Sequence, residues 1–500
     1  MKKNSLTTAI LAGVAGVAGL AGVAHAVNLN PDGLGQVLIY PYYTVNGGNS
    51  TLVTVVNTTN QVKAVKVRFV EALNSAEVLD FNLYLSPFDV WAANVISSDT
   101  GGAALNVTDS SCTVPNIVNG QEFLTYEFTN NNPDALRGLG LPRVRQRHLE
   151  VIEMGVVVDA DLAAAATHTA GGSPLDCGAL QAAWEMAPWA ANPHAGMEAP
   201  SGGLFGGATI ISGEYGRTLS YNADAIDGFF RGQANTLHTN PGSVFPNLGF
   251  AATEVTGEAV ARVFSNGDLY EIPYTDGIDA VSAVFQSRYI YNEFNLNAGL
   301  NAASEWVITF PTKRAYVYGG AALPFTTAFP VASNPNFTGS CHSYRISYWN
   351  REERTTSQGL TVSPPAPTQG FGLCWEANVL AFGQTLTTTT PTRILGTTPV
   401  FGANGLSGFA FQEGWARIEF DAPAAGFQYW LPSDDGQALV GQPVTGFWAS
   451  EVVNTNVEAG VRANYGVIHK HRVSRDCRAH TAGTTTGVLP DATVACPTTR

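Results

Sequence analysis

Cationic side chains are scarce in this 500-residue sequence. Charged residues make up 13% of the chain, against 45% hydrophobic residues. Beyond residue 3, lysine occurs only at Lys63, Lys66, Lys313 and Lys470. The polar surface must therefore consist mostly of Asn, Thr, Ser, Gln and Gly, a composition that is common in extracellular β proteins. The 52 glycines and 27 prolines are spread among β-branched and aromatic runs, which indicates a turn-rich fold.

The sequence also lacks a second long apolar run. The first run, 9–23, follows Lys2 and Lys3 and precedes Ala24-His25-Ala26. A charged start, a short apolar stretch and small residues before a cleavage point form the pattern of a secretory signal. We therefore predict a signal peptide over 1–26 and a mature chain without a transmembrane helix. The expected location is the cell surface or the extracellular space, with the periplasm as the alternative.

Basic residues are too few to balance the acidic ones. Without the two signal lysines, 24 of the 26 basic residues remain against 40 acidic residues, a formal charge of −16. Such a surface repels phosphate backbones and anionic lipid. We therefore expect no nucleic-acid partner. The expected partners are a second copy of the chain or a surface polysaccharide.

Short catalytic motifs are absent as well. The sequence has no G-x-S-x-G elbow, H-E-x-x-H, P-loop, Rossmann glycine fingerprint or complete EF-hand loop. No two cysteines have C-x-x-C spacing, which argues against a cysteine metal site. We therefore assign no catalytic residue, cofactor or metal ligand. Whether the protein is an enzyme stays open, because a glycosidase needs only two carboxylates that the fold brings together; a non-catalytic role is favoured.

Six cysteines in an exported chain predict disulfide bonds. Proximity in the sequence favours three local pairs, which are Cys112 with Cys177, Cys341 with Cys374, and Cys477 with Cys496. By loop entropy, each bond stabilises the fold by about 3 to 4 kcal/mol.

Alternation of apolar and polar residues predicts a mainly β fold. Val65, Val67 and Phe69 alternate with Lys66 and Arg68, which is typical of a half-buried strand with one wet face. Similar patterns predict strands at 51–56, 79–85, 122–128, 147–158, 253–264, 282–294, 306–310, 338–349, 371–382, 414–420, 426–430 and 446–453. The predicted class is antiparallel β-sandwich domains with one or two short helices and long loops.

The helices and the domain boundary are expected near the middle of the chain. The alanine-rich segments 161–166 and 177–186 predict the helices, and the Pro/Gly-rich segment 188–207 predicts a boundary. The expected division is an N-terminal β-sandwich domain over 27–200 with a short helical insert and a C-terminal β-rich domain over 201–500. The second domain could contain two subdomains. A bond between Cys341 and Cys374 would join neighbouring strands.

One charged cluster follows an aromatic strand. Arg351-Glu352-Glu353-Arg354 comes directly after Trp349. Two carboxylates beside a stacking surface suit a sugar, so Trp349, Glu352 and Glu353 are weak candidates for a carbohydrate site. The favoured interpretation is a charged hairpin end whose acids pair with its own arginines.

Two histidine clusters are further candidates. His469 and His471 would share one face of a strand and could bind a divalent metal, but no third ligand lies near them in sequence, so an exposed strand end is favoured. His148 and Glu150 would share a face while Glu153 points away. That geometry does not suit three ligands of one metal.

The last candidate is Tyr40-Pro41-Tyr42-Tyr43 near the mature start. Stacked tyrosines can hold carbohydrate. The favoured interpretation is packing in the core or between domains, with the hydroxyl groups reaching solvent.

Four segments of the sequence resemble those of a known protein family. They are 38–44 (LIYPYYT), 78–87 (VLDFNLYLSP), 150–155 (EVIEMG) and 307–314 (VITFPTKR). Together they resemble a family of uncharacterised exported or cell-surface proteins of Gram-negative bacteria. The resemblance implies a location and no activity, so it supplies no site residue.

Three functional hypotheses follow. The leading one is an exported non-catalytic structural or adhesive protein of the cell surface or extracellular space. The second is a secreted carbohydrate-binding or carbohydrate-active protein, based on the aromatic residues and on Glu352 and Glu353. The third is an outer-membrane β-barrel; the terminal Pro-Thr-Thr-Arg and the paired cysteines argue against it.

Overall fold

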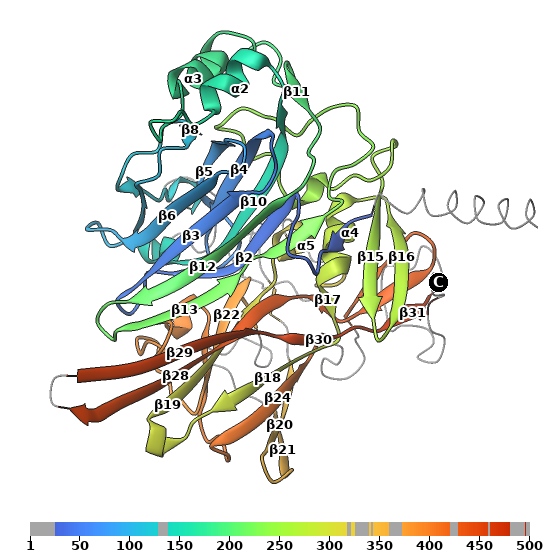
Figure 1. Cartoon of the computed structure of the whole chain (residues 1–500). Coiled ribbons are helices and arrows are strands. Elements are labelled where there is room, and N and C mark those ends of the chain that lie inside the picture. The colour runs from blue at the N-terminus through green and yellow to red at the C-terminus, as the bar shows by residue number, and fades with distance from the viewer. Residues whose placement is uncertain are drawn as a thin grey trace, which may run out of the picture.

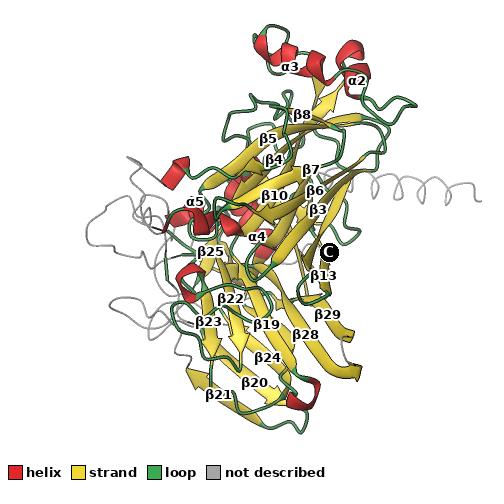
Figure 2. Ribbon diagram, turned by 90° about the vertical axis from the view of Figure 1, so that its left-hand side faces the viewer, coloured by secondary structure: helices red, strands yellow, loops and turns green. Residues whose placement is uncertain are grey.

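Two β-sandwiches form the body of the protein in the computed structural model. The structure describes residues 26–128, 139–317, 322–325, 340–341, 344–359, 373–420, 429–458, 461–480 and 496. Figures 1 and 2 show one sandwich stacked on the other, with helices α2 and α3 at the far end of the first. Antiparallel pairs dominate the described sheets, so the predicted mainly β class is confirmed.

The first sandwich consists of an eight-stranded and a six-stranded sheet. The eight-stranded sheet has the order β1-β14-β2-β10-β4-β5-β8, with β11 paired to β10. Its strands are β1 (Asn28–Leu29), β14 (Asp224–Asp227), β2 (Val37–Thr44), β10 (Gln146–Val157), β4 (Val62–Val70), β5 (Glu77–Leu85), β8 (Cys112–Val114) and β11 (Met197–Glu198). The six-stranded sheet contains, in order, β13 (Arg217–Asn222), β12 (Leu204–Ser212), β3 (Asn49–Asn57), β6 (Val90–Ser97), β7 (Ala103–Val107) and β9 (Gln121–Glu122).

The second sandwich consists of two five-stranded sheets. One contains, in order, β23 (Ala403–Leu406), β22 (Ala377–Phe382), β19 (Ala302–Thr309), β28 (Thr445–Glu458) and β29 (Val461–Lys470). The other, here called the distal sheet, contains β21 (Thr355–Gly359), β20 (Arg345–Asn350), β24 (Glu413–Glu419), β18 (Tyr289–Asn295) and β30 (Arg472–Ser474). Rings from both sheets, such as Phe294 against Phe382 at 5.8 Å, fill the core between them.

Shorter elements surround the two sandwiches. The small sheets pair β15 (Ala259–Ser265) with β16 (Asp268–Tyr274), β17 (Gln286–Ser287) with β27 (Gln442–Pro443), and β26 (Gln437–Val440) with β25 (Trp430–Pro432) and β31 (Cys477–Ala479). The described part of the chain contains the α-helices α2 (Ala160–Ala166), α3 (Cys177–Glu185), α4 (Gly277–Phe285) and α5 (Lys313–Val317). Single 3-10 turns are η1 (Tyr126–Phe128), η3 (Leu141–Arg145), η4 (Leu248–Phe250), η5 (Ala298–Leu300) and η6 (Pro399–Phe401).

The eight-stranded sheet is covered on both faces. Val65 and Val67 pack toward the six-stranded sheet, as their alternation predicts. The expectation that the other face of this strand is in contact with solvent is wrong, because Lys66 is fully buried and Arg68 is only 9% exposed. A loop lies over them, and the Lys66 Nζ donates to the carbonyl of Pro241 at 3.1 Å. Burial of such cations requires partners, which the acids of neighbouring strands supply.

The two sandwiches share a continuous apolar core. The cluster between the first two sheets extends to Val307, Val379 and Phe447 of the second sandwich. The Tyr42 hydroxyl lies 2.6 Å from the Thr397 hydroxyl across the same boundary. Moreover, β12 pairs with β3 and β14 pairs with β2, so residues 204–227 complete the first sandwich. The expected division at residue 200 therefore does not coincide with the division of the sheets.

Local structure differs from the sequence predictions in several segments. The first half of the predicted strand 253–264 precedes β15 and is not a strand. The predicted strand 122–128 contains only the end of β9 and the turn η1, and the first half of the predicted strand 282–294 belongs to helix α4. Helix α4 is apolar on nearly all sides and its last six residues are buried. An apolar run of that kind does not show whether it forms a buried helix or a buried strand. The two alanine-rich helices are confirmed as α2 and α3, begun by the N-caps Asp159 and Asp176.

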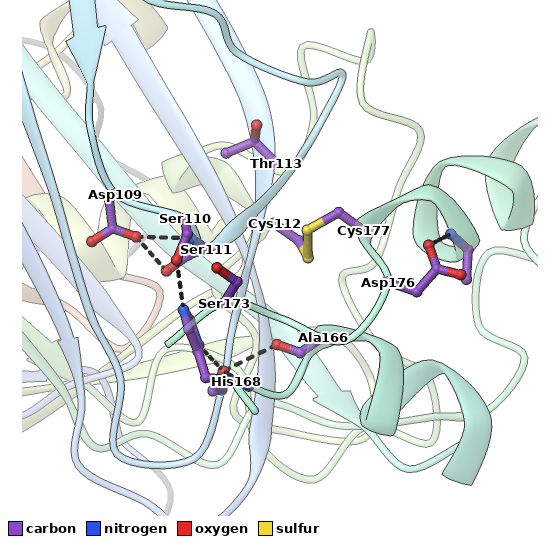
Figure 3. The surroundings of a disulfide bond; sticks show 12 residues. Asp109, Ser110, Ser111, Cys112, Thr113, Ala166, His168, Ser173, Asp176 and Cys177 are labelled. Carbon is purple, nitrogen blue, oxygen red and sulfur yellow. Dashed lines mark hydrogen bonds between the residues drawn. A yellow bond between two sulfur atoms is a disulfide. The ribbon is translucent and has the colours of Figure 1, made fainter. Parts of the chain in front are cut away.

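All six cysteines form disulfides in the predicted pairs. Figure 3 shows Cys112 of β8 bonded to Cys177, the first residue of α3, beside the capping residue Asp176. The Cys341–Cys374 bond precedes β20 and β22, which lie in opposite sheets of the second sandwich. The expectation that this bond joins neighbouring strands is therefore wrong.

Some predictions concern residues outside the described ranges. The signal peptide falls there except for Ala26, and so do most of 426–430 and the start of 338–349. Among the described residues, no helix is both long and apolar enough to cross a bilayer.

A buried histidine predicts a loss of stability in acid. His238 is fully buried, with Nδ1 2.7 Å from the Pro193 carbonyl and Nε2 2.9 Å from the Tyr84 hydroxyl. Burial lowers its pKa to about 3. An unfolded histidine binds its proton near pH 6.5, so the unfolded state gains more protons as the pH falls from about 6.5 toward 3, and the free energy of unfolding decreases.

The variant His238→Gln removes this titration. We expect the wild-type protein to lose more stability than the variant between pH 6.5 and 4 in urea unfolding at fixed salt. His148 and His471, whose pKa values burial lowers to about 4, contribute equally to both proteins. Parallel pH profiles for the two proteins would contradict the assignment.

Candidate functional site

A row of aromatic side chains lies on the outer face of the distal sheet. Trp349 of β20 is directly opposite Trp415 of β24, and Tyr289 and Tyr291 project from the neighbouring strand β18. Alternation explains this arrangement, because the intervening residues Ile290 and Ala416 face the core. We call these four aromatic residues, together with Arg417, the aromatic platform. Figure 1 shows β20, β21 and β24 at the end of the molecule farthest from α2 and α3.

The four rings contact one another in sequence. The Trp349 and Trp415 rings stack with centroids 4.0 Å apart and planes 11° apart. Tyr291 follows at 6.2 Å from Trp415, and Tyr289 lies 6.3 Å from Tyr291. Trp415 is 40% exposed and the other three are half-buried. The platform therefore presents ring surface to solvent while the sheet holds each ring in place.

A guanidinium group lies within this row. The Arg417 Cζ is 4.8 Å from the Tyr289 ring centroid and 5.7 Å from that of Trp349. Glu419 on the same strand accepts a hydrogen bond from Arg417 at 2.5 Å and lies 3.8 Å from Arg345. Contacts between a cation and aromatic rings stabilise both partners, and they order the side chains that a flat ligand would meet.

Two local features position the tryptophan pair. A Cβ at Gly414 would lie 1.8 Å from the Trp349 carbonyl oxygen, so only glycine permits β24 to approach β20 this closely. The turn after β20 is closed by Asn350, whose Oδ1 accepts from the amides of Glu352 at 3.1 Å and Arg354 at 2.9 Å. Both features fix the register that brings Trp349 opposite Trp415.

The three predicted carbohydrate candidates separate in the structure. Trp349 belongs to the aromatic platform, whereas Glu352 and Glu353 are exposed at the tip of the β20–β21 hairpin. Glu352 accepts a hydrogen bond from the Asn350 side chain at 2.6 Å. Arg351 pairs with Glu413 of β24 at 2.5 Å rather than with either neighbouring acid. The expected pairing within the charged cluster is therefore wrong for Arg351.

Sequence reasoning missed the larger part of the platform. Tyr289 and Tyr291 alternate with Ile290, and Trp415 and Arg417 alternate with Ala416, so each strand carries a visible outward face. The strands are far apart in sequence. Only the strand order β20-β24-β18 brings their outward faces together.

The tyrosines of β2 are core residues. Tyr40, Tyr42 and Tyr43 are all at most 1% exposed, which agrees with packing rather than with a sugar site. Their hydroxyls do not reach solvent, contrary to expectation. The Tyr40 hydroxyl donates to the Thr54 carbonyl at 2.7 Å, and that of Tyr43 donates to the Val144 carbonyl at 3.1 Å.

The histidine clusters have structural contacts. His148 Nε2 lies 3.1 Å from a carboxylate oxygen of Glu150. Glu153 points away from them, as the alternation predicted, and forms an ion pair with Lys63 of β4. The ring centroid of His471 lies 4.9 Å from that of Trp306. The ring centroid of His469 lies 5.6 Å from that of Trp448. Within the described ranges no three His, Cys, Asp or Glu side chains form a group suited to a metal ion.

Comparison with known proteins gives no relative for this chain. No family model matches it, and no curated protein and no solved structure shows significant similarity. The resemblance noted in the sequence therefore remains a prediction.

Proposed function

We propose that this protein is an exported, non-catalytic adhesive protein of the cell surface or extracellular space that binds polysaccharide through the aromatic platform. The proposal rests on one observation, which is the stacked Trp349–Trp415 pair on the open face of the distal sheet. Sugar rings have apolar C–H faces that pack on aromatic rings, and their hydroxyls accept hydrogen bonds from groups such as guanidinium.

The shape of the platform supports an extended ligand. Its four rings come from three adjacent strands and follow one another across the sheet. A polymer lying across the strands could meet several rings at once, and each contact can be weak because the contacts act together. This suits adhesion to a polymer better than capture of a single small sugar.

Two of the acids beside the platform are ion-paired, which favours binding over hydrolysis. Glu413 is ion-paired with Arg351 and also accepts from the Asn297 side chain at 2.8 Å. Glu419 is paired with Arg417 at 2.5 Å. A glycosidase needs one carboxyl group that is protonated at working pH and one that is free to attack or to activate water. These two carboxylates, held by arginines, do not meet that requirement. The remaining acid of this face is Glu293 of β18, which lies opposite Trp415 and is exposed to solvent.

The experiment removes the exposed indole. We expect the mature protein to be retarded in native gels containing laminarin, xylan or alginate, or to sediment with cellulose. Trp415→Ala should weaken the affinity for the retained polymer by about tenfold or more, because aromatic anchors dominate such surfaces. The thermal midpoint of the variant checks that the sheet remains folded.

Phe264→Ala is the matched control. Phe264 is 64% exposed on the β15–β16 hairpin, which is separate from the distal sheet. This variant should bind as the wild type does. Failure of the wild-type protein to bind any of the four polymers, or equal binding by folded Trp415→Ala, would overturn the proposal.

A further inference from the structure

A cavity of about 480 Å³ lies over the outer face of the eight-stranded sheet, remote from the aromatic platform. Arg68 of β4, Glu77 of β5 and Glu150 of β10 form its floor. Its walls include the apolar side chains of Leu248 of η4 and Ile278 of α4 together with polar ones. Cavities of this size, with apolar walls and a few convergent polar groups, are typical small-molecule sites.

The floor carries an excess of negative charge. The Arg68 guanidinium donates to Glu77 Oε2 at 3.1 and 3.2 Å from two nitrogens, and also to Glu150 Oε2. One guanidinium thus faces two carboxylates, and both carboxylates line the cavity. The side-chain exposures are 10% for Arg68, 16% for Glu77 and 6% for Glu150. Charges that are so little exposed are poorly screened by water.

Neighbouring groups do not supply the missing positive charge. His148 bonds the other oxygen of Glu150, but its pKa is lowered to about 4, chiefly by burial, so it is neutral near pH 7. Lys66 is matched by Asp80 at 3.1 Å. At the cavity wall, Glu127 and Arg314 also carry opposite charges.

One carboxylate oxygen remains available. Glu77 Oε1 accepts no hydrogen bond from any residue in the part of the chain that the structure describes, whereas Oε2 accepts two. In the absence of a cation, a proton can offset the excess charge. In agreement, the pKa of Glu77 is raised to about 7, mainly by burial, with Asp80 adding to the rise and Arg68 and Lys66 opposing it.

We propose that the cavity is a binding site for a small organic cation, an amine with an apolar body, whose ammonium group pairs with Glu77. The ammonium donates to Glu77 Oε1 and neutralises the floor, and the apolar body packs against Leu248 and Ile278. An anion would add to the negative excess, and a neutral molecule would leave it uncompensated. The site is independent of polysaccharide binding, because none of its residues belongs to the platform.

The test uses three probes that share a phenyl body. Isothermal titration with phenethylamine at pH 8 should give saturable binding, whereas 2-phenylethanol and 3-phenylpropionate should bind at least about tenfold more weakly, because a charged hydrogen bond is lost. Affinity for phenethylamine should fall as the pH is lowered from 8 to 6, since the proton then competes for Glu77.

Two variants test the site itself. Glu77→Gln keeps the side-chain size and an acceptor for Arg68, and should weaken phenethylamine binding about tenfold at pH 8 and remove its dependence on pH. Ala315→Trp places a large ring at an exposed lining position and should also weaken binding without altering the buried charges. Glu185→Gln, on the exposed side of α3, should bind as the wild type does.

Three results would overturn the proposal. They are no saturable binding of phenethylamine by the wild-type protein, equal binding of the three probes, and unchanged binding by folded Glu77→Gln. Polymer retention by the same variants, measured in parallel, should be unaffected. A failure here is therefore distinguishable from a failure of the proposed adhesive function.

Discussion

Replacing Arg147 by methionine is expected to lower the free energy of unfolding by about 3 to 5 kcal/mol. Arg147 is fully buried and bonds groups of both sandwiches. Its Nε lies 2.8 Å from His148 Nδ1, and its terminal nitrogens reach the Glu71 carbonyl, the Ser75 hydroxyl at 2.5 Å and the Glu376 carboxylate at 2.5 Å. Removing the guanidinium leaves a buried carboxylate and a buried carbonyl without their donor, which is the costly case.

Equilibrium urea unfolding measures this effect. Arg231→Met is the matched control, because Arg231 forms an ion pair with Asp227 whose side chains are 30% and 37% exposed. Exposed pairs of this kind contribute about 0 to 1 kcal/mol. The double variant Arg147→Met/Glu376→Leu should recover part of the loss, since the Glu376 carboxylate is no longer left without its donor. A single variant as stable as the control, or a double variant less stable than the single one, would contradict the account.

Loss of the Cys112–Cys177 bond is expected to cost about 4 kcal/mol, and loss of the Cys477–Cys496 bond about 3 kcal/mol. The cysteines are 65 residues apart in the first pair and 19 apart in the second. A longer loop restricts the unfolded chain more when it is closed, so its removal should be the more destabilising.

The two double alanine variants, compared in urea without reductant, test this order. In the variant lacking Cys112 and Cys177, helix α3 also loses its covalent connection to β8, so limited proteolysis should cut first within 160–200. The control is the other double variant, which leaves that connection intact. Equal losses of stability, or a larger loss for the shorter loop, would show that native packing rather than loop length dominates.

Local patterns predicted the elements whose chemistry is itself local. Alternation such as that of Val65 to Phe69 identified β4, and proximity identified all three disulfides. The same reasoning failed for helix α4. Most of its residues are apolar and buried, so the sequence does not show the alternation of polar and apolar faces that distinguishes a helix from a strand. It also failed for the second face of β4, since Asn240 and Pro241 of a loop 174 and 175 residues later in the chain cover that face.

The candidate site depends on long-range register and could not be predicted as a unit. Trp349 was identified because an aromatic residue next to two acids is visible in the sequence. Trp415 and Tyr291 were not, because their proximity arises from the order of strands in the distal sheet. The cavity shows the same limit, since Arg68, Glu77 and Glu150 come from three strands that pair only in the folded protein.

The shared core has a consequence for the order of folding. Tyr42 of β2 hydrogen-bonds to Thr397 and packs against Phe447, so the core that the two sandwiches share stays incomplete until residues beyond 440 have been synthesised. A chain that emerges from its amino end therefore exposes the apolar residues of this shared core until the second sandwich has been made. We expect slow acquisition of the native state and a need for chaperones that cover this apolar surface during synthesis, a need that a protein of two self-sufficient halves would not have.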